Sequence, residues 1–330
     1  MAKSNDFTAI VLAAGKGKRM SSPLPKVLHP VAGWPMISRV ITSVQQAGAT
    51  QIRVVVGHGS ELVERVVGPM GAVCFTQKEQ KGTAHAVQCA RPEELRGTVV
   101  ILNGDHPLIT AEQISMLVKE FVETKSSLSV VTAQLKNPKQ FGRIIRHHGQ
   151  LKAIVEARDA SHQTLQIKEV NTGIYLVKAE VLCDLLPKIR PQNNQNEYYL
   201  TDIVSLALDA EKSVHAILAS SATAFGVNTQ VELAKASRYI YAQKVQALMA
   251  EGAIIIDPQS TYIEDDVVVG AGTVIYPGSH LRSGTRVGGY CVIEPNCYLS
   301  KSQIGDSLQV RAGSYFEEVS VGDKAVIGPY

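Results

Sequence analysis

The sequence predicts an α/β fold with a mainly parallel sheet, followed by a short parallel β-helix, and three observations support this prediction. Short β-branched runs alternate with helical patterns from Thr8 to about Leu218, which is the rhythm of a layered sheet with crossover helices. Aliphatic residues then recur at every sixth position from Ile263 to Leu299, which is the pattern of a hexapeptide β-helix. The 330 residues, of which 45% are hydrophobic and 19% charged, suffice for about two globular domains and exclude a disordered chain.

The first part of the chain carries the signals of individual strands and helices. Five β-branched or apolar runs are expected strands, at residues 8–12, 51–56, 72–76, 98–102 and 128–133. Residues 36–47 and 111–122 place apolar side chains at helical spacing, as expected of crossover helices. Residues 141–156 differ, because two β-like runs flank the polar tip His147-His148-Gly149. We therefore expect a β-hairpin beside the sheet.

The last third of the chain predicts a long helix and then the repeats. Residues 229–250 carry apolar side chains on more than one helical face, which indicates a helix connecting two domains. Beyond Leu299 the six-residue register shifts twice by one residue and ends at Ile327, which gives about three to four turns if three hexapeptides form one turn. We expect a first domain over 1–228, a connecting helix over 229–252 and a truncated hexapeptide-repeat β-helix over 253–330.

Composition and charge narrow the class of partner and the compartment. Lys plus Arg total 33 against 30 Asp plus Glu, so a net charge of +3 does not call for a nucleic acid or an anionic membrane. No run of 18 apolar residues offers membrane insertion. Five cysteines form no CxxC pair, and an odd number without a secretory signal favours reduced thiols. The expected localisation is cytoplasmic.

The loop after the first strand is suited to a phosphate chain. Gly15 and Gly17 let backbone N–H groups approach a ligand, while Lys16, Lys18, Arg19 and Lys26 add positive charge. The loop is neither a Walker P-loop nor GxGxxG, because Met20 stands where the third glycine belongs. From composition alone, an ordinary strand-to-helix loop with solvated lysines is an equal alternative.

The string from Leu12 to Met20 resembles the signature L-A-A-G-x-G-x-R-M of the sugar-nucleotide pyrophosphorylases, which is followed by P-K as at Pro25-Lys26. Further matching strings are Gln77-Lys-Glu-Gln-Lys-Gly82-Thr83-Ala-His-Ala, Asn103-Gly104-Asp105, Phe141-Gly142-Arg143-Ile144, Glu169-Val-Asn171-Thr-Gly173-Ile-Tyr175, Glu197-Tyr-Tyr-Leu-Thr-Asp202 and Gly226-Val-Asn228. They are most similar to the N-acetylglucosamine-1-phosphate uridylyltransferases. The repeat region resembles the start of the acetyltransferase half of bifunctional members. The resemblance spans Thr8 to Tyr330 and implies a Rossmann-like nucleotidyltransferase domain and a left-handed β-helix.

The resemblance implies that the sugar 1-phosphate attacks the α-phosphorus of UTP in line and that pyrophosphate leaves. Arg19 and Lys26 would be the catalytic residues, which hold the triphosphate and the forming diphosphate. Asp105 and Asn228 would bind one Mg²⁺, which prefers oxygen ligands. By the same resemblance the uracil is read by Ala13, Gly15, Gln77, Gly82 and Thr83, and the sugar by Gly142, Glu156 and Asn171. The remaining expected contacts to substrate are Leu12, Ala14, Lys26, Asn103, Gly104, Asp105 and Asn228.

Simpler interpretations stand beside these assignments. Gln77 alone reads as a surface glutamine after a strand, and Gly104-Asp105 alone reads as a turn or helix cap. Structural or exposed roles are expected for the histidines, because no HExxH and no His/Cys cluster is present. These residues are His29, His85, His106, His147 and His148.

Other functions also stay open. Asn103 and Ala84 depart from a bacterial member that has tyrosine and glycine there, which leaves another sugar 1-phosphate or another base possible. A non-catalytic scaffold is a further alternative, whereas a glycosyltransferase lacks its Asp-x-Asp motif near residue 105. Later solenoid turns carry the acetyltransferase residues of bifunctional members, so acetyl transfer is expected to be absent. Such repeats commonly pack as trimers, and we expect a homotrimer.

Overall fold

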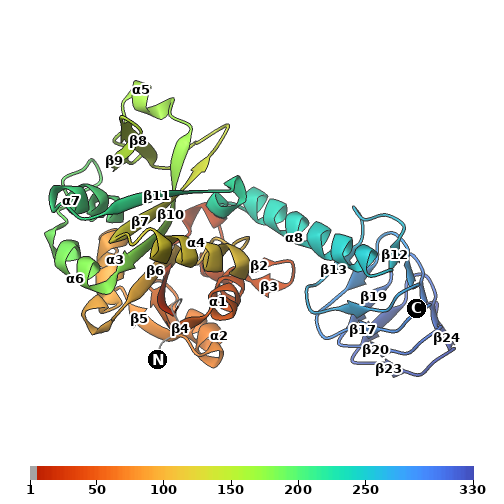
Figure 1. The fold of residues 1–330 in the computed structure, drawn as a ribbon. Coiled ribbons are helices and arrows are strands. Elements are labelled where there is room, and N and C mark those ends of the chain that lie inside the picture. The colour runs from red at the N-terminus through yellow and green to blue at the C-terminus, as the bar shows by residue number, and fades with distance from the viewer. Residues whose placement is uncertain (1–5) are drawn as a thin grey trace. The chain divides into compact units, whose positions relative to one another are not determined.

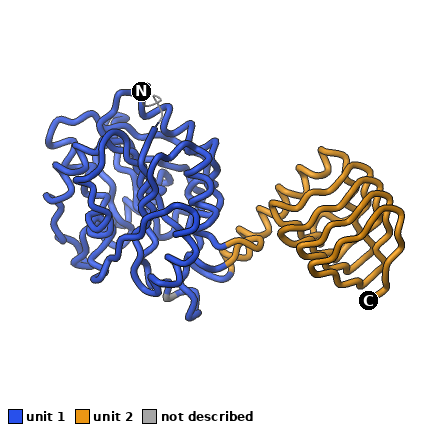
Figure 2. Tube along the Cα trace, turned by 90° about the horizontal axis from the view of Figure 1, so that it is seen from below, with its two compact units in different colours: residues 1–29, 35–230 blue, residues 30–34, 231–330 orange. Residues whose placement is uncertain are grey.

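The computed structural model describes residues 6–330, without the side chain of Lys18. Two compact units are distinguished by their internal contacts (Figure 2). Unit 1 comprises residues 1–29 and 35–230, and unit 2 comprises residues 30–34 and 231–330.

Unit 1 is built on one mixed sheet with the strand order β11-β7-β10-β6-β1-β4-β5, and β8 and β9 extend it through β10 (Figure 1). Its strands are β1 (Phe7–Ala13), β4 (Ala49–Val56), β5 (Val73–Thr76), β6 (Thr98–Asn103), β7 (Leu128–Gln134), β8 (Arg143–His147), β9 (Gln150–Val155), β10 (Glu169–Lys178) and β11 (Val214–Ala219). Strands β6, β1, β4 and β5 are parallel, and β11 is parallel to β7. Strand β10 runs antiparallel to both β6 and β7. The expected mainly parallel sheet is therefore confirmed.

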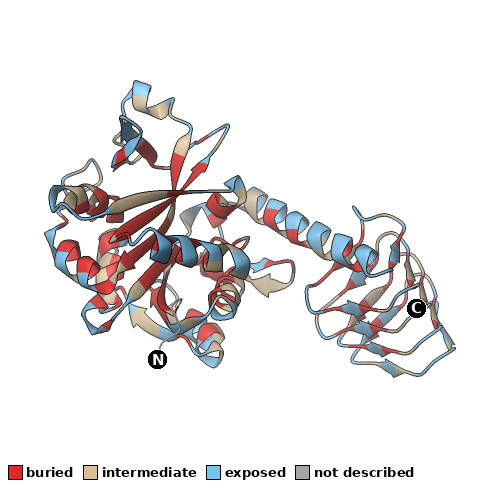
Figure 3. Cartoon of the chain, in the orientation of Figure 1, coloured by how far each residue is buried: buried red, intermediate tan, exposed pale blue. Residues whose placement is uncertain are grey.

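Helices cover both faces of this sheet because its strands alternate apolar side chains between them. Along β1, Ala9 and Val11 pack with one core, whereas Ile10 packs with the other. The first core includes α1 (Met36–Gln46), α2 (Ser60–Val67) and α4 (Ala111–Glu123), and the second includes α3 (Thr83–Cys89), α6 (Ala179–Leu185) and α7 (Ile203–Asp209). Figure 3 shows the sheet as mostly buried and the outer helix faces as exposed.

The predicted hairpin is present, since β8 and β9 pair antiparallel with His147 opposite Gln150. Short α5 (His162–Leu165) follows it. The sequence analysis did not predict β10 and β11. Strand β11 lies at the edge of the sheet, where Ile217 is buried and Val214, Ala216 and Ala219 are partly buried against the two cores.

Unit 2 stacks thirteen short parallel strands in sheets of five, four and four, the arrangement of a left-handed parallel β-helix. The strands are β12 (Ile254–Ile255), β13 (Tyr262–Ile263), β14 (Val268–Val269), β15 (Val274–Ile275), β16 (His280–Leu281), β17 (Arg286–Val287), β18 (Val292–Ile293), β19 (Tyr298–Ser300), β20 (Gln303–Ile304), β21 (Gln309–Val310), β22 (Tyr315–Glu317), β23 (Ser320–Val321) and β24 (Val326–Ile327). The predicted aliphatics from Ile263 to Leu299 are buried inside it. Stacking each turn on the next buries these side chains.

Two further parts of the chain belong to unit 2. Helix α8 (Gln230–Ala250) coincides with the predicted long helix and contributes Val245 and Leu248 to the core of the repeats. The short strands β2 (Pro30–Val31) and β3 (Trp34–Pro35) form a hairpin whose Ala32 N–H donates to Ser237 Oγ on α8. No helix within residues 6–330 is long and apolar enough to cross a membrane.

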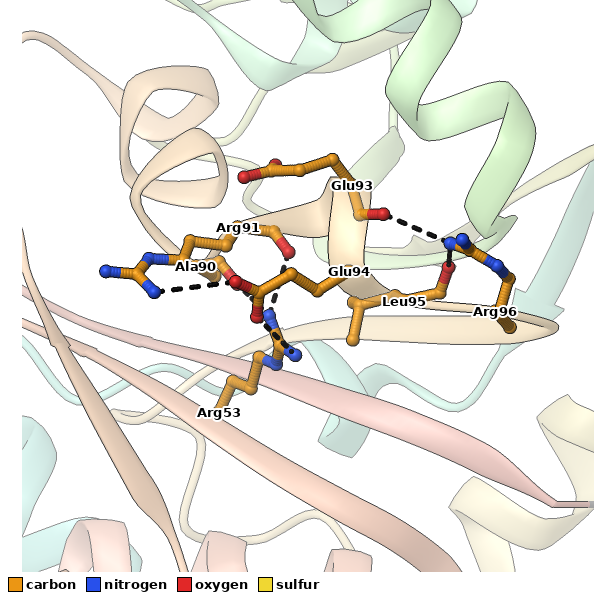
Figure 4. A network of polar contacts seen from close by, with 7 residues as sticks. All are labelled: Arg53, Ala90, Arg91, Glu93, Glu94, Leu95 and Arg96. Carbon is orange, nitrogen blue, oxygen red and sulfur yellow. Dashed lines mark hydrogen bonds and ion pairs between the residues drawn. The ribbon is translucent and has the colours of Figure 1, made fainter.

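A buried arginine fixes the edge of unit 1 beside β4 (Figure 4). The Arg53 guanidinium donates to the carbonyl oxygens of Ala90 and Arg91 at 2.6 and 2.8 Å and pairs with Glu94 at 3.1 Å. It also lies over the Phe75 ring, 5.1 Å from the centroid. One side chain therefore holds the chain that follows α3 against the sheet.

Replacement of Arg53 by methionine should lower the free energy of unfolding of unit 1 by about 2 kcal/mol, because two carbonyl groups lose their donor while the apolar stem is retained. Urea denaturation measures this loss. The control is Arg91→Met, since Arg91 is exposed and pairs with the same Glu94, and we expect a change below about 1 kcal/mol. Equal losses in both variants would contradict the assigned role of Arg53.

Candidate active site

The predicted substrate residues gather at the carboxyl edge of the parallel strands, where α/β proteins bind ligands. Two adjoining cavities lie there, with volumes of about 260 and 280 Å³. They share Leu12, Thr83, Asn103 and Asp105. We call them the loop cavity and the hairpin cavity. The loop cavity is also lined by Ala13, Ala14, Gly15, Lys26, Gln77 and Gly82, and the hairpin cavity by Gly142, Glu156, Asn171 and Asn228.

Gly15 and Gly17 of the first loop favour glycine for different structural reasons. A side chain on Gly15 would meet no protein atom within 4 Å, so the space beside Gly15 is open to a ligand. Gly17 has a φ of +59°, and a Cβ there would lie 2.7 Å from Cβ of Lys26. Gly17 therefore lets the loop fold back onto Lys26, which begins the short helix Lys26–Leu28.

Lys26, Asp105 and Asn228 meet where the two cavities join. The Lys26 ammonium donates to Asp105 Oδ2 and, at 3.0 Å, to Asn228 Oδ1. The Lys26 and Asp105 side chains are only 14% and 15% exposed. A carboxylate oxygen and an amide oxygen thus face one cationic position, which is a donor set for a hard metal ion.

The backbone explains how Asn228 reaches Asp105 across 123 positions of sequence. Asp105 follows β6, and its carbonyl oxygen accepts from the N–H of Val227 at 2.9 Å. The neighbouring Gly226 leaves room for the His106 ring, because a Cβ at Gly226 would lie 2.9 Å from His106 Nε2. The strand end and the segment before α8 are therefore joined directly at the site.

Two opposing effects act on the Asp105 carboxyl. Burial raises its pKa, but the Lys26 ammonium, His106 and hydrogen bonds together hold the pKa of Asp105 below its ordinary value of 3.8. The ionised carboxylate therefore stabilises the fold above that ordinary value, and this contribution is lost as the pH falls through the lower folded pKa. Burial also lowers the pKa of His106, so this ring is neutral at pH 7.

Gln77 is buried, and its amide is fixed on the wall of the loop cavity. Its Nε2 donates to the carbonyl oxygen of Gly82 at 3.1 Å and lies 3.0 Å from Nδ1 of His85. Its backbone N–H donates to Val56 at the end of β4. The interpretation of Gln77 as a surface residue is wrong, because only 4% of the residue is exposed.

Strand pairing brings Gly142, Glu156 and Asn171 together in the hairpin cavity, which sequence spacing did not indicate. The Asn171 N–H donates to the Gly142 carbonyl oxygen at 2.9 Å. A Cβ at Gly142 would lie 3.4 Å from Glu156 Oε1, so glycine lets this carboxyl approach the backbone. The hairpin therefore brings Gly142 and Glu156, two of the predicted sugar contacts, beside Asn171 near the start of β10.

A bulge in β10 aims Asn171 and makes room for Asn103. The pairing with β7 shifts between Asn171 and Tyr175, where Gly173 has a φ of +81°. Asn171 Oδ1 accepts from the Gly173 N–H at 2.9 Å, and its Nδ2 donates to the Tyr175 hydroxyl at 2.7 Å. A Cβ at Gly173 would lie 2.5 Å from Asn103 Nδ2. The Asn171 side chain is thus held rigidly before any ligand binds.

Glu156 also borders a third cavity that contains two further carboxyl groups. Asp159 and Asp202 line this space of about 500 Å³ together with Glu156. Burial, and then the negative charges of Asp159 and Asp202, raise the pKa of Glu156 above 4.5. The protonated form of Glu156 is therefore favoured by the fold over a wider pH range than in the unfolded chain.

The raised pKa of Glu156 predicts a stability effect that depends on pH. The protonated carboxyl stabilises the fold below the ordinary pKa, and this contribution is lost as the pH rises through the folded pKa. Glu156→Gln imitates the protonated form, so at pH 7.5 it should unfold at a higher urea concentration than the parent, and near pH 4 at the same concentration. Exposed Glu180 offers the control Glu180→Gln, and a variant without this pH-dependent gain would contradict the prediction.

Two predicted site residues line neither cavity. Arg19 is exposed in the short helix Lys18–Met20, and Gly104 lies behind the lining, where its N–H donates to Leu12 O. Several lining residues had no expected role from the sequence, and these are Gln80, Gln140, Thr172 and Thr201. His106 was expected to be structural or exposed, but it lines the hairpin cavity and its Nε2 lies 3.6 Å from Asp105 Oδ1. Its position directly after Gly104-Asp105 was the available signal.

Known proteins share both parts of the chain. Residues 9–170 match the MobA-like NTP transferase domain, and residues 266–301 match the bacterial transferase hexapeptide repeats. Over 324 residues the chain is 54% identical to the bifunctional protein GlmU of Bdellovibrio bacteriovorus, with 98% of this chain and 71% of that protein covered. The chain belongs to the GlmU family. GlmU of Carboxydothermus hydrogenoformans is 42% identical over 323 residues, with coverages of 97% and 72%.

Membership of the GlmU family and the matching NTP transferase domain make this chain a nucleotidyltransferase. The resemblance given by the sequence motifs is confirmed. A solved structure from Bacillus anthracis, described as a candidate glucose-1-phosphate thymidylyltransferase in complex with sucrose, has a TM-score of 0.57 at 22% identity and covers 70% of this chain and 94% of its own. At this identity the similarity supports the fold alone.

Proposed function

We propose that this chain forms UDP-N-acetylglucosamine and pyrophosphate from UTP and N-acetylglucosamine 1-phosphate. One observation carries the proposal: the Lys26 ammonium joins Asp105 and Asn228 where the loop cavity meets the hairpin cavity. A nucleotide in the loop cavity and a sugar phosphate in the hairpin cavity would bring their phosphates together at this junction. In the reaction a phosphate oxygen of the sugar phosphate bonds to the α-phosphorus, and the bond to pyrophosphate breaks.

The side chains have distinct roles in this proposal. Lys26 contacts the reacting phosphates and neutralises charge that moves toward pyrophosphate, while Arg19 binds the outer phosphates from the exposed loop. Glu156 and Asn171 bind sugar substituents, and Gly142 leaves space for them. The uracil lies against Ala13, Gly15, Gln77, Gly82 and Thr83. Leu12, Ala14 and Asn103 form the floor between the two substrates, and Gly104 supports Leu12 from behind.

The donor set fits Mg²⁺, because Asp105 and Asn228 present one carboxylate and one amide oxygen to a single cationic position. Within residues 6–330, no group of three His, Cys, Asp or Glu side chains is arranged to hold a metal, which leaves this pair with oxygens from substrate and water. When bound, Mg²⁺ would stabilise negative charge on the phosphates.

Product analysis tests the proposed function. The protein is incubated with UTP, Mg²⁺ and each of N-acetylglucosamine, glucose, N-acetylgalactosamine and N-acetylmuramic acid 1-phosphates, and the nucleotide sugars are identified by mass spectrometry. We expect N-acetylglucosamine 1-phosphate to have the highest kcat/KM. Preference for another sugar would assign the site to that substrate, and absence of every nucleotide sugar would reject the reaction.

We further propose that residues 1–228 perform this reaction, that 229–252 connect the domains and that the β-helix of residues 253–330 forms a homotrimer. Stacked hexapeptide turns offer flat faces for such packing, and light scattering distinguishes a trimer from a monomer. The expectation that acetyl transfer is absent stays a prediction, which an assay with acetyl coenzyme A and glucosamine 1-phosphate checks.

A further inference from the structure

The amide of Gln77 has its two protons directed at protein acceptors. Its Nε2 is 3.1 Å from the carbonyl oxygen of Gly82 and 3.0 Å from Nδ1 of His85. A carboxamide nitrogen carries two protons and accepts nothing. When His85 accepts at Nδ1, both protons are engaged by Gly82 and His85, and the group that Gln77 can offer to a ligand in the loop cavity is its oxygen.

His85 can act as an acceptor only when its proton is on the other ring nitrogen. A neutral imidazole has one donor nitrogen and one acceptor nitrogen, so acceptance at Nδ1 places the proton on Nε2. His85 Nε2 lies 4.0 Å from Cys89 Sγ, one turn further along α3. The thiol is a weak acceptor for this proton, and burial raises the pKa of Cys89, which keeps the thiol neutral.

The opposite orientation of the Gln77 amide is unfavourable at both contacts. Rotation by 180° would place the amide oxygen against the Gly82 carbonyl oxygen, which only accepts. It would also require the His85 proton to move from Nε2 to Nδ1, which gives up the contact of Nε2 with Cys89 Sγ. Gly82 is itself fixed, because its φ is +111° and a Cβ there would lie 2.5 Å from the carbonyl oxygen of Tyr198.

We propose that His85 is a positioning residue that fixes the Gln77 amide with its oxygen toward the base and so selects uracil over cytosine. This inference rests on the proposed use of UTP. Uracil carries a proton on N3 and can donate to the Gln77 oxygen, whereas N3 of cytosine carries a lone pair and meets that oxygen as a second acceptor. Thymine has the same N3 proton as uracil, so the contact does not separate UTP from dTTP.

Two substitutions separate the acceptor from the bulk of His85. His85→Phe keeps a ring of similar shape and removes Nδ1, whereas His85→Asn keeps an acceptor near the Nδ1 position. In His85→Phe one Gln77 proton loses its partner, so only the Gly82 carbonyl oxygen still holds the amide, and the amide turns more readily to present N–H groups to cytosine. A site built around one hydrogen-bonding pattern rejects the wrong partner strongly, so losing its orientation should reduce the UTP-to-CTP ratio of kcat/KM by about 10- to 100-fold.

The test measures kcat/KM for UTP, CTP and dTTP with saturating sugar phosphate. We expect the UTP-to-CTP ratio to fall in His85→Phe, mainly through KM for UTP, and to return to within a few-fold of the parent in His85→Asn. The UTP-to-dTTP ratio should stay unchanged in both variants. An unchanged UTP-to-CTP ratio in His85→Phe, or an equal fall in His85→Asn, would overturn the inference. Thermal unfolding of each variant confirms that the protein is folded.

Calorimetry separates this inference from the proposed reaction. Dissociation constants for UTP and CTP in the presence of Mg²⁺ are measured with the parent and with His85→Phe, without sugar phosphate. A parent that binds UTP more tightly than CTP, together with a loss of that preference in His85→Phe, supports the role of His85 even if no nucleotide sugar forms. A parent that binds both nucleotides equally, or binds neither, overturns it.

Discussion

Replacement of Asp105 by asparagine should reduce kcat/KM for nucleotide-sugar formation by about 10³-fold, because the site loses the negative charge that faces the cation position while its shape is retained. The Lys26 ammonium would then be paired only with neutral oxygens, of which Asn228 Oδ1 lies at 3.0 Å. Steady-state kinetics over a range of Mg²⁺ concentrations measures the effect. Part of the lost rate should return at high Mg²⁺ if Asp105 serves metal affinity.

The matched control for this variant is Asp184→Asn. Asp184 pairs with Lys188 at 2.8 Å, as Asp105 pairs with Lys26, but the side chains of Asp184 and Lys188 are both about half exposed. We expect unchanged kinetics and a stability change below about 1 kcal/mol. Because the pKa of Asp105 is lowered in the fold, the free energy of unfolding of the parent decreases at acid pH as Asp105 is protonated. Asp105→Asn should not show this part of the decrease. A parent-like rate in Asp105→Asn would exclude Asp105 from the reaction.

Replacement of Lys26 by methionine should reduce kcat/KM by about 10³-fold and lower the free energy of unfolding by about 3 kcal/mol. The rate falls because the phosphates lose a cationic donor, and the stability falls because a buried carboxylate loses its partner. Double replacement with Asp105→Asn should recover part of the stability but none of the rate. Urea denaturation and steady-state kinetics of the three proteins complete this double-mutant cycle.

The same Lys26→Met variant should bind a divalent ion more tightly when no nucleotide is present. In the parent, the Lys26 ammonium lies where Asp105 and Asn228 converge, so it competes with a metal ion for both oxygens. Removing this charge should raise Mn²⁺ affinity by roughly tenfold or more, as measured by electron paramagnetic resonance. Lys188→Met serves as the exposed control. Weaker Mn²⁺ binding in Lys26→Met would show that Lys26 and the metal do not compete.

Residues close together in sequence allowed the clearest predictions. The glycine-containing loop follows the end of β1, and Asp105 follows the end of β6, which is the parallel neighbour of β1. Parallel strands bring such ends to one edge of the sheet. The six-residue register also predicted the β-helix reliably, because each buried aliphatic from Ile263 to Leu299 occupies the same position in its repeat. Local pattern and tertiary structure agree in both places.

The hairpin cavity could not be predicted from spacing, because strand order creates it. Antiparallel β10 enters between β6 and β7, so its first residues, rather than its last, reach the carboxyl edge beside Asn103. The bulge at Gly173 then turns Asn171 toward the cavity. The contact between the backbones of Gly142 and Asn171 comes from the pairing of β8 with β10, and this pairing has no signal in a single sequence.

Charge and hydrogen-bond states were also beyond sequence reasoning. Glu156 reads as an ordinary glutamate after a strand, but burial, and then the charges of nearby Asp159 and of Asp202 from a distant segment, raise its pKa. His85 reads as a helical histidine, yet it contacts Gln77, which precedes it by eight positions across a turn. Such roles depend on distances of a few ångströms between separate elements.

An isotope measurement tests the junction of Lys26, Asp105 and Asn228 most directly. N-acetylglucosamine 1-phosphate labelled with ¹⁸O at every phosphate oxygen is incubated with UTP, Mg²⁺ and either the parent protein or Asp105→Asn, and the products are analysed by mass spectrometry. Attack by the sugar phosphate at this junction predicts that the parent transfers all of the label to the nucleotide sugar and none to pyrophosphate, and that Asp105→Asn forms product about 10³-fold more slowly. Label in pyrophosphate, or equal rates for the two proteins, would contradict it.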